Sequence, residues 1–277
     1  MTTTTAPTTT VDPYAPAAPA SAWHFLHHLN PLSKVAAVAP AMVMLIFVRD
    51  LATPAFFIAL AYAIILVGAR LTLRTVALLF IAVPVGITAI GFGFSLWVDA
   101  AGVKDTVPFL QIGDWTLFTG ALQVGFATAL RLAAILALAL VGGLTTTGPD
   151  LVRASIQHLR VPYRIGYTAL AAYRFVPRFG HELAVIRAAH RVRGHHGGRG
   201  PFARLVRGWG YIVPLLAGAI RHAERVALAM DARAFGAYPT RTERYLVPFR
   251  ARDVAFIIIA LVASATIFTA LFPWQPS

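Results

Sequence analysis

The sequence lacks cysteine, has only two lysines, and is poor in charge, with 13% charged residues among 277. Without cysteine there is no disulfide, no thiolate-bound zinc or iron–sulfur cluster and no thiol nucleophile. A phosphate-binding GxxxxGK[ST] loop needs a lysine, and neither Lys34 nor Lys104 stands in that motif. HExxH and GxSxG are also absent, so the sequence carries no zinc-protease or serine-hydrolase signature. We therefore expect a chain that is not an enzyme.

Apolar residues, by contrast, make up 58% of the chain, whereas soluble domains hold about 45–50% apolar and about 25% charged residues. A membrane-spanning helix takes about 20 mostly apolar residues. The stretches that approach this length are residues 32–48, 51–69, 76–98, 117–143 and 254–272. The first two are separated by Arg49 and Asp50 alone and are expected to form a tight hairpin. The sequence predicts an all-α, polytopic membrane protein of about five transmembrane helices.

Four regions follow from this pattern. Residues 1–31 form an N-terminal tail that starts with Thr, Ala and Pro, is too poor in large apolar groups to fold alone and is expected to be disordered. It lacks the basic start and apolar core of a secretory signal peptide. Residues 32–144 hold four transmembrane helices, residues 145–250 are basic, and residues 251–277 hold the last transmembrane helix and the C-terminus.

Positive charge is concentrated in one region. The net charge is +13, and residues 145–250 carry 17 arginines against five acidic residues. Lys and Arg mark the cytoplasmic side of a bilayer. Arg70 and Arg74, between the second and third spans, belong on the same side as this region. We expect a plasma-membrane protein with its N-terminus and residues 145–250 in the cytoplasm and its C-terminus outside.

Within the basic region the apolar residues recur at intervals of three and four, which is typical of helices with one apolar face. Two such helices are predicted at residues 182–193 and 215–233, and a third segment, starting at Thr145–Thr147 with Pro149 and Asp150, has the pattern of a helix start. Arg193 precedes Gly194, and Arg233 precedes Gly236 by three residues. Glycine commonly ends a helix, and a cation is favoured at its negative end.

Other functions were weighed against this pattern. A secondary carrier, or an integral membrane enzyme with its own polar site, needs ionisable groups within the spans. Only Arg131 places a charge deep in a span, and we expect it to bond carbonyls of neighbouring helices rather than line a site. The histidines His190, His195 and His196 have no carboxylate beside them to complete a metal site. Either membrane function remains the alternative.

Aromatic residues alternate with arginines between residues 163 and 179. Proteins that bind single-stranded nucleic acids by base stacking have a similar pattern. The same spacing suits an aromatic belt at a membrane interface. No recognition motif accompanies the charge, so no nucleic-acid partner is expected.

Four runs in the basic region occur in a fixed order: Leu-Thr-Thr-Thr-Gly-Pro-Asp-Leu at residues 144–151, Tyr-Arg-Phe-Val-Pro at 173–177, Ala-Ala-His-Arg-Val-Arg-Gly at 188–194, and Ala-Leu-Ala-Met-Asp-Ala-Arg-Ala-Phe-Gly at 227–236. Together they resemble the transmembrane (T) component of energy-coupling factor (ECF) transporters. The resemblance implies a non-catalytic scaffold with two or three amphipathic cytoplasmic coupling helices. Its partners would be the lipid bilayer, two ATP-binding cassette ATPase subunits, and a small membrane (S) subunit that captures a vitamin or a cation such as cobalt or nickel. ATP would be bound by the ATPases, and this chain would hold no cofactor. Substrate specificity would reside in the S subunit.

The resemblance also implies a partner-binding site. In the family, two short Ala-Arg-Gly or Ala-Arg-Ser motifs end the coupling helices, and each docks on one ATPase. Here they match Val192-Arg193-Gly194 and Ala232-Arg233-Ala234, with departures at Val192 and Ala234. Arg193 and Arg233 are the expected coupling residues, because the planar guanidinium can make bidentate bonds in an acidic groove. Four neighbouring residues would set the helix geometry: Arg191, Glu182, Glu224 and Asp231.

Overall fold

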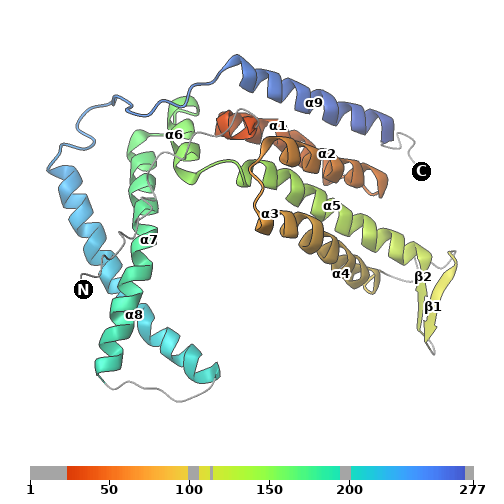
Figure 1. Cartoon of the computed structure of the whole chain (residues 1–277), viewed down its shortest axis with the longest axis horizontal. Coiled ribbons are helices and arrows are strands. Elements are labelled where there is room, and N and C mark those ends of the chain that lie inside the picture. Colours follow the sequence, from red (N-terminus) through yellow and green to blue (C-terminus); the bar gives the residue numbers. More distant parts are fainter. Residues whose placement is uncertain (1–23, 99–105, 113–114, 194–200, 272–277) are drawn as a thin grey trace, which may run out of the picture. The chain divides into compact units, whose positions relative to one another are not determined.

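The computed structural model describes residues 24–98, 106–112, 115–193 and 201–271, and the chain divides into two compact units (Figure 1). The membrane unit comprises Met1–Thr146 and Phe249–Ser277, and the basic unit comprises Thr147–Pro248. The two units are described separately below.

The membrane unit is a bundle of apolar helices. Its elements, in chain order, are the short 3-10 helix η1 (Phe25–His28), α1 (Pro31–Leu45), α2 (Ala52–Gly68), α3 (Leu73–Ala77), the π-helical turn η2 (Leu78–Ala82), α4 (Val83–Ser95), β1 (Pro108–Ile112), β2 (Trp115–Phe118), α5 (Thr119–Gly143) and α9 (Ala251–Leu271). The all-α prediction therefore holds apart from one small antiparallel hairpin, β1–β2, which the sequence analysis did not foresee.

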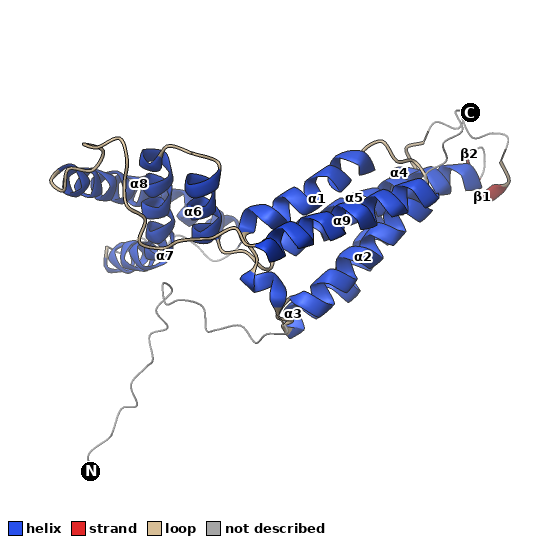
Figure 2. Cartoon of the chain, turned by 90° about the horizontal axis from the view of Figure 1, so that it is seen from above, coloured by secondary structure: helices blue, strands red, loops and turns tan. Residues whose placement is uncertain are grey.

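Three segments among the described residues are long and apolar enough to cross a bilayer: Leu73–Ser95, Thr119–Gly143 and Ala251–Leu271. The first two predicted spans correspond to α1 and α2, which are apolar but shorter, with 15 and 17 residues. The expected tight hairpin is not their main packing. Both helices pack on α5 and α9, and α1, α5 and α9 run along one another in Figure 2. The reason is that α5 offers a face of small residues, which lets other helices approach closely.

The third predicted span is one continuous helical segment, Leu73–Ser95, that contains the π-helical turn η2. Pro84 has no N–H and its ring crowds the preceding turn, so the helix widens just before it. The Tyr62 hydroxyl donates to the Leu79 carbonyl oxygen at 2.6 Å. This bond from α2 satisfies a carbonyl in the irregular turn, as a polar group in an apolar environment requires.

The core lies where α2, α5 and α9 meet. Phe57 packs on Phe268 with ring centroids 5.0 Å apart, and both belong to one cluster with Ala134 and Ala137 of α5. On the other side of α5, a Cβ added at Gly125 would lie 2.2 Å from the Ser95 Oγ atom of α4. Only glycine permits that approach.

The N-terminal tail was predicted to be disordered through residue 31, and this is wrong for residues 24–31. Residues 25–28 form η1, Leu26 and Leu29 are buried, and Asn30 caps α1 by accepting from the Leu32 N–H at 2.9 Å. The segment is ordered because its apolar side chains pack on the bundle, a long-range contact that its composition does not reveal. Residues 1–23 lie outside the described residues.

The basic unit contains α6 (Gly148–His158), α7 (Tyr163–Val192) and α8 (Pro201–Asp231). The predicted start of α6 is confirmed, since Thr147 is its N-cap and accepts from the Asp150 N–H at 3.3 Å. The predicted helices at residues 182–193 and 215–233 are the C-terminal parts of α7 and α8. The expected starts were wrong, because both helices continue through an internal proline, Pro177 and Pro214.

Candidate functional site

The helices α7 and α8 cross as an antiparallel pair (Figure 1). Phe175 stacks on His222 at 4.2 Å between ring centroids, and further along α7 His190 meets Tyr211 edge-on at 5.3 Å. As the residue number rises on α7 it falls on α8, so the two C-termini lie at opposite ends of the pair. These C-termini carry the two predicted coupling arginines.

The first of these ends, the α7 tip, consists of residues 191–193. Arg193 is the C-cap residue of α7, and its main-chain N–H donates to the Ala189 carbonyl at 3.1 Å. Arg191, Val192 and Arg193 are all exposed, and Val192 is 90% exposed. Gly194, predicted to end this helix, lies outside the described residues. About three helical turns before the tip, Glu182 pairs with Arg178 at 3.3 Å, an exposed i,i+4 contact within α7. The tip therefore presents cationic side chains to its surroundings.

The second end, the α8 tip, consists of residues 232–234 and has a different termination. Ala234 has a positive φ of 54°, the Phe235 N–H donates to the Met230 carbonyl at 3.0 Å, and the Ala234 N–H donates to the Asp231 carbonyl at 2.9 Å. This is a Schellman motif, in which the residue with positive φ is usually glycine. The sequence analysis assigned the stop to Gly236, and this is wrong, because Ala234 ends the helix. Arg233, just before it, is exposed.

The segment after the α8 tip, Phe235–Val247, is bound to the start of α7 and to α6, and we call it the strap. The Tyr163 hydroxyl donates to the Tyr238 carbonyl at 2.5 Å, and the Arg164 guanidinium donates to the Gly236 carbonyl. Gly236 has a φ of 89°, and a Cβ there would lie 3.0 Å from the Arg164 Nε atom. Here the chain needs glycine both for its backbone conformation and for space.

Side chains complete the attachment of the strap. The Tyr167 hydroxyl donates to the Glu243 Oε2 atom at 2.5 Å, and the Arg241 guanidinium lies over the Tyr167 ring at 4.5 Å and over the Phe235 ring at 5.5 Å. Burial, together with the bond to Glu243, raises the pKa of the Tyr167 phenol above its ordinary value. At the other end of the strap, Gln157 of α6 bonds the main chain of Tyr245 and Val247.

The two arginine tips are consequently far apart, but both are connected to the helix α7. Phe235, two residues after Arg233, packs edge-on against Tyr163 at the start of α7. Arg193 ends the same helix, and a helix of 30 residues is about 45 Å long. Thus α7 carries Arg193 at its C-terminal end. Its N-terminal end binds the strap, which follows Arg233. Two separated cationic forks on a common rod can each bind an acidic groove.

Arg131, the charge predicted deep in a span, bonds main-chain carbonyls as expected. Its Nη1 atom donates to the carbonyls of Ile46 and Val48 at 3.2 and 3.3 Å, at the C-terminal end of α1. A cation there complements the negative end of the helix. Arg131 therefore has structural partners in the main chain at the end of α1.

Two buried charges, Lys34 and Asp253, were missed by the sequence analysis. Each is 1% exposed. Lys34 donates to the Thr145 carbonyl at 2.8 Å and to the Thr146 hydroxyl at 3.1 Å, just beyond the end of α5. Asp253 accepts from the Asn30 N–H at 2.6 Å and from the Ser33 hydroxyl at 3.1 Å. They tie the ends of α1, α5 and α9 together. Both residues stand near helix ends, where charged residues are usually solvated, so their burial is not evident from the sequence pattern.

The histidines and aromatic residues considered for metal and nucleic-acid binding lie partly within the described residues. The described residues contain no group of three or more metal-binding side chains, and His195 and His196 lie outside them. The aromatic residues considered for base stacking serve internal packing, since Tyr163 and Tyr167 hold the strap and Phe175 stacks on His222.

Comparison with known proteins gives a consistent result. A family model described as CbiQ, a cobalt transport protein, matches residues 23–244. The energy-coupling factor transporter transmembrane protein EcfT of Bacillus subtilis (strain 168) is 26% identical over 166 residues, which cover 57% of this chain and 63% of that protein. EcfT of Thermotoga maritima is 30% identical over 154 residues, covering 52% and 56%.

A third relative is larger. The putative ABC transporter ATP-binding protein BL0043 of Bifidobacterium longum is 29% identical over 174 residues, which cover 60% of this chain but 22% of that protein. The chain thus spans less than two thirds of the length of these three relatives. The resemblance to ECF T components that four sequence motifs predicted is confirmed by the family model and by the relatives named EcfT. Since the family model covers well over half of the residues, the chain belongs to the CbiQ family of cobalt transport proteins.

Proposed function

We propose that this chain is the energy-coupling scaffold of an ECF-type importer, linking two ATP-binding cassette ATPase subunits to a separate substrate-binding membrane subunit. The observation that carries the proposal is the pair of exposed arginines, Arg193 and Arg233, at opposite ends of one crossed helix pair. Two alike tips suit two equivalent partners. The names of the relatives, EcfT and an ABC transporter ATP-binding protein, support partners of this kind.

The proposed mechanism is mechanical. When ATP draws the two ATPases together, the tips bound to them must move, and α7 and α8 change their crossing angle. Energy then passes through contacts that differ between two states, with no chemistry in this chain. The apolar helices of the membrane unit would carry the motion to the substrate-binding subunit, whose cargo would be a vitamin or a transition-metal cation such as cobalt.

The same proposal implies on which side of the membrane the basic unit lies. The basic unit would face the cytoplasm at the plasma membrane, where the ATPases have access to ATP. Its excess of arginine supports this side of the bilayer. Gly194, Ala232, Ala234 and Arg191 would contact the ATPases beside the two arginines.

The test is co-purification of the tagged chain with its ATPases from the native membrane. Arg193→Ala combined with Arg233→Ala should lower the recovery of the ATPases by at least tenfold, because the loss of charge-assisted bidentate bonds leaves acidic partner groups unpaired. The matched control is Arg221→Ala combined with Arg225→Ala, which removes the same charge from exposed positions in the C-terminal half of α8. Equal recovery from the tip variant and the control would contradict the proposal.

A separate experiment addresses the carrier alternative. The purified chain alone, reconstituted in liposomes, should move no cobalt or vitamin under a proton or sodium gradient. Gradient-driven uptake by the isolated chain would support a secondary carrier instead.

A further inference from the structure

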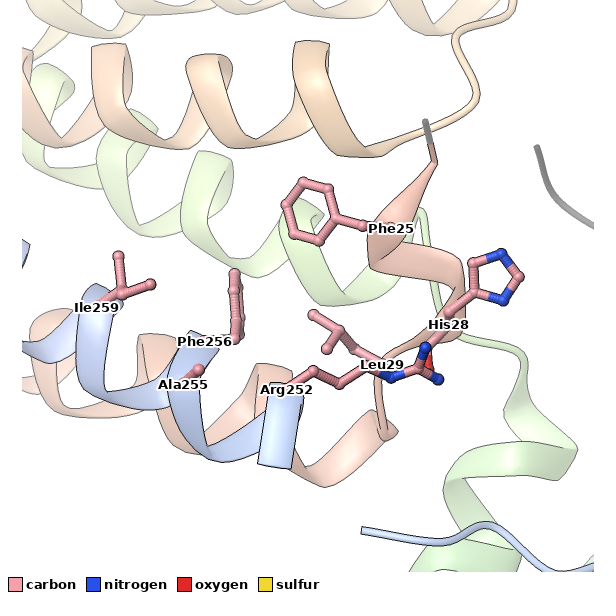
Figure 3. Close-up of a pocket in the computed structure, with 7 residues that line it drawn as sticks. All are labelled: Phe25, His28, Leu29, Arg252, Ala255, Phe256 and Ile259. Atoms are coloured by element: carbon pink, nitrogen blue, oxygen red, sulfur yellow. The ribbon is translucent and has the colours of Figure 1, made fainter. Parts of the chain in front are cut away.

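The membrane unit contains a lateral cavity of about 520 Å³ that the coupling function does not use (Figure 3). Four of its lining residues belong to α9 and follow one helical face at positions i, i+3, i+4 and i+7: Arg252, Ala255, Phe256 and Ile259. The opposite wall is formed by the segment around η1, with Phe25, His28 and Leu29. The volume falls in the range of about 300–1,000 Å³ that small-molecule sites occupy.

The cavity is polar at one end and apolar at the other. Arg252 lies in the first turn of α9, and its guanidinium donates one hydrogen bond to the His28 carbonyl. A guanidinium has five N–H donors, and among the described residues this bond uses one of them. Figure 3 shows Arg252 beside His28, with Phe256 and Ile259 further along α9 and the Phe25 ring on the η1 side. The Phe25 and Phe256 rings meet edge-on at 6.3 Å.

The α9 residues that line the cavity extend over a length comparable to a lipid head group and the first part of an acyl chain. From Arg252 to Ile259 the α9 axis advances about 10 Å, and α9 is one of the helices long and apolar enough to cross a bilayer. The cation therefore lies at the end of a span, and the apolar wall continues toward the middle of that span. Basic pockets between membrane helices bind anionic head groups.

The local charges favour an anion. Asp253, the nearest acidic residue, lies on a different face of α9 from the cavity residues and is buried against the Asn30 N–H, the Ser33 hydroxyl and the Arg250 N–H. Its charge is directed into the bundle. At the cavity itself the charged group is Arg252, with the imidazole ring of His28 beside it.

We propose that this cavity binds an anionic phospholipid, with its phosphate on Arg252 beside His28 and an acyl chain along Phe25, Phe256 and Ile259. The proposal is independent of the coupling function, since it involves neither arginine tip. A bound lipid would fill the space between the N-terminal segment and α9.

The test is native mass spectrometry of the full-length chain, released from detergent micelles supplemented with equal amounts of phosphatidylglycerol and phosphatidylcholine. The wild type should retain phosphatidylglycerol in preference. Arg252→Gln should lower that preference about fivefold, the effect of one interfacial cation, because the amide can still donate to His28 but carries no charge. Arg250→Gln is the matched control, since it loses the same charge while the structure uses its main-chain N–H.

The outcomes are distinct. An unchanged preference in Arg250→Gln with a loss in Arg252→Gln supports the site. An equal loss in both variants indicates a general surface charge and overturns it, as does equal retention of the two lipids by the wild type. Displacement of phosphatidylglycerol by excess inorganic phosphate would assign the site to a free anion and would also overturn the lipid proposal. Ala255→Trp gives a second check, because the bulky ring should exclude the acyl chain and lower the retention of both lipids.

Discussion

The two arginine tips end similar helices but are supported in different ways. The α7 tip finishes at an exposed C-cap residue, Arg193, whose main-chain N–H donates to the Ala189 and Arg191 carbonyls. The α8 tip finishes in a Schellman motif and leads directly into the strap, which Tyr163, Arg164 and Tyr167 hold against α7. The α7 tip is therefore a helix terminus, whereas the α8 tip is a turn that is followed by a segment bound to α7.

This difference between the tips indicates how one chain can hold two exposed arginines in fixed positions. The α8 tip has its orientation set by the start of α7, whose other end is the α7 tip. A force on either tip is thus applied to the same helix. We expect substitutions in the strap to alter the α8 tip and to leave the α7 tip unchanged.

Gly236→Ala should have the largest effect on the strap. The added Cβ must adopt a φ of 89° and displace Arg164, at a cost of about 2 kcal/mol. Hydrogen exchange of the Phe235–Val247 amides should become roughly 30-fold faster, with no change at residues 185–193. Gly180→Ala is the control, since a Cβ there meets nothing within 4 Å and alanine favours a helix. Faster exchange at both tips would show that the strap does not act locally.

Tyr167→Phe should have the next largest effect. It removes the hydrogen bond to the Glu243 carboxylate, a type of bond that contributes about 1.5 kcal/mol at its lower limit. Exchange of the strap amides should rise about tenfold. Tyr173→Phe removes a hydroxyl from a half-exposed ring of the same helix and should have little effect. Similar changes in both variants would refute a specific role for Tyr167.

Ala234→Gly should stabilise the α8 tip. Glycine adopts the φ of 54° found at this position without the strain that alanine bears, which is worth about 1 kcal/mol. Exchange around residue 235 should slow about fivefold. Ala232→Gly, two residues earlier and before the residue with positive φ, should act in the opposite direction by a similar amount. A destabilising effect of both substitutions would argue against the Schellman motif.

The pH dependence of the strap gives the smallest expected effect. The pKa of Tyr167 is raised in the folded chain by burial and by Glu243, so folding favours the neutral phenol. This contribution is complete below the ordinary tyrosine pKa of about 10 and is lost as the pH rises through the folded value. The stability advantage of the wild type over Tyr167→Phe should therefore shrink above about pH 10, as judged by exchange of the strap amides. A constant difference at all pH values would contradict this assignment.

Local signals in the sequence predicted much of the fold. The Thr-Gly-Pro-Asp run fixed the start of α6 because capping involves neighbouring residues. Arg131 was correctly assigned to main-chain carbonyls, since a lone charge within a span has few alternatives. The apolar stretches gave the membrane helices, although α1 and α2 pack on α5 and α9 instead of forming a tight hairpin.

The remaining features depend on contacts between distant residues. Pro177 and Pro214 obscured the first halves of α7 and α8, which the crossing contacts stabilise. The strap joins residues about 75 positions apart, such as Tyr163 and Tyr238. Lys34 and Asp253 are buried only because three helix ends converge on them. Contacts of this kind produce no periodic pattern of residues, so they cannot be recognised in the sequence.

The most direct test of the central claim uses the absence of cysteine from this chain. A single cysteine introduced as Val192→Cys or as Ala232→Cys, labelled with a maleimide photocrosslinker, reports the neighbour of each tip in the assembled complex. Val262→Cys, on the exposed apolar surface of α9, is the control. We expect crosslinks to the ATP-binding subunits from both tips and none from residue 262. Crosslinks from one tip alone, or equally from residue 262, would contradict the claim that the two arginine tips dock on two ATPases.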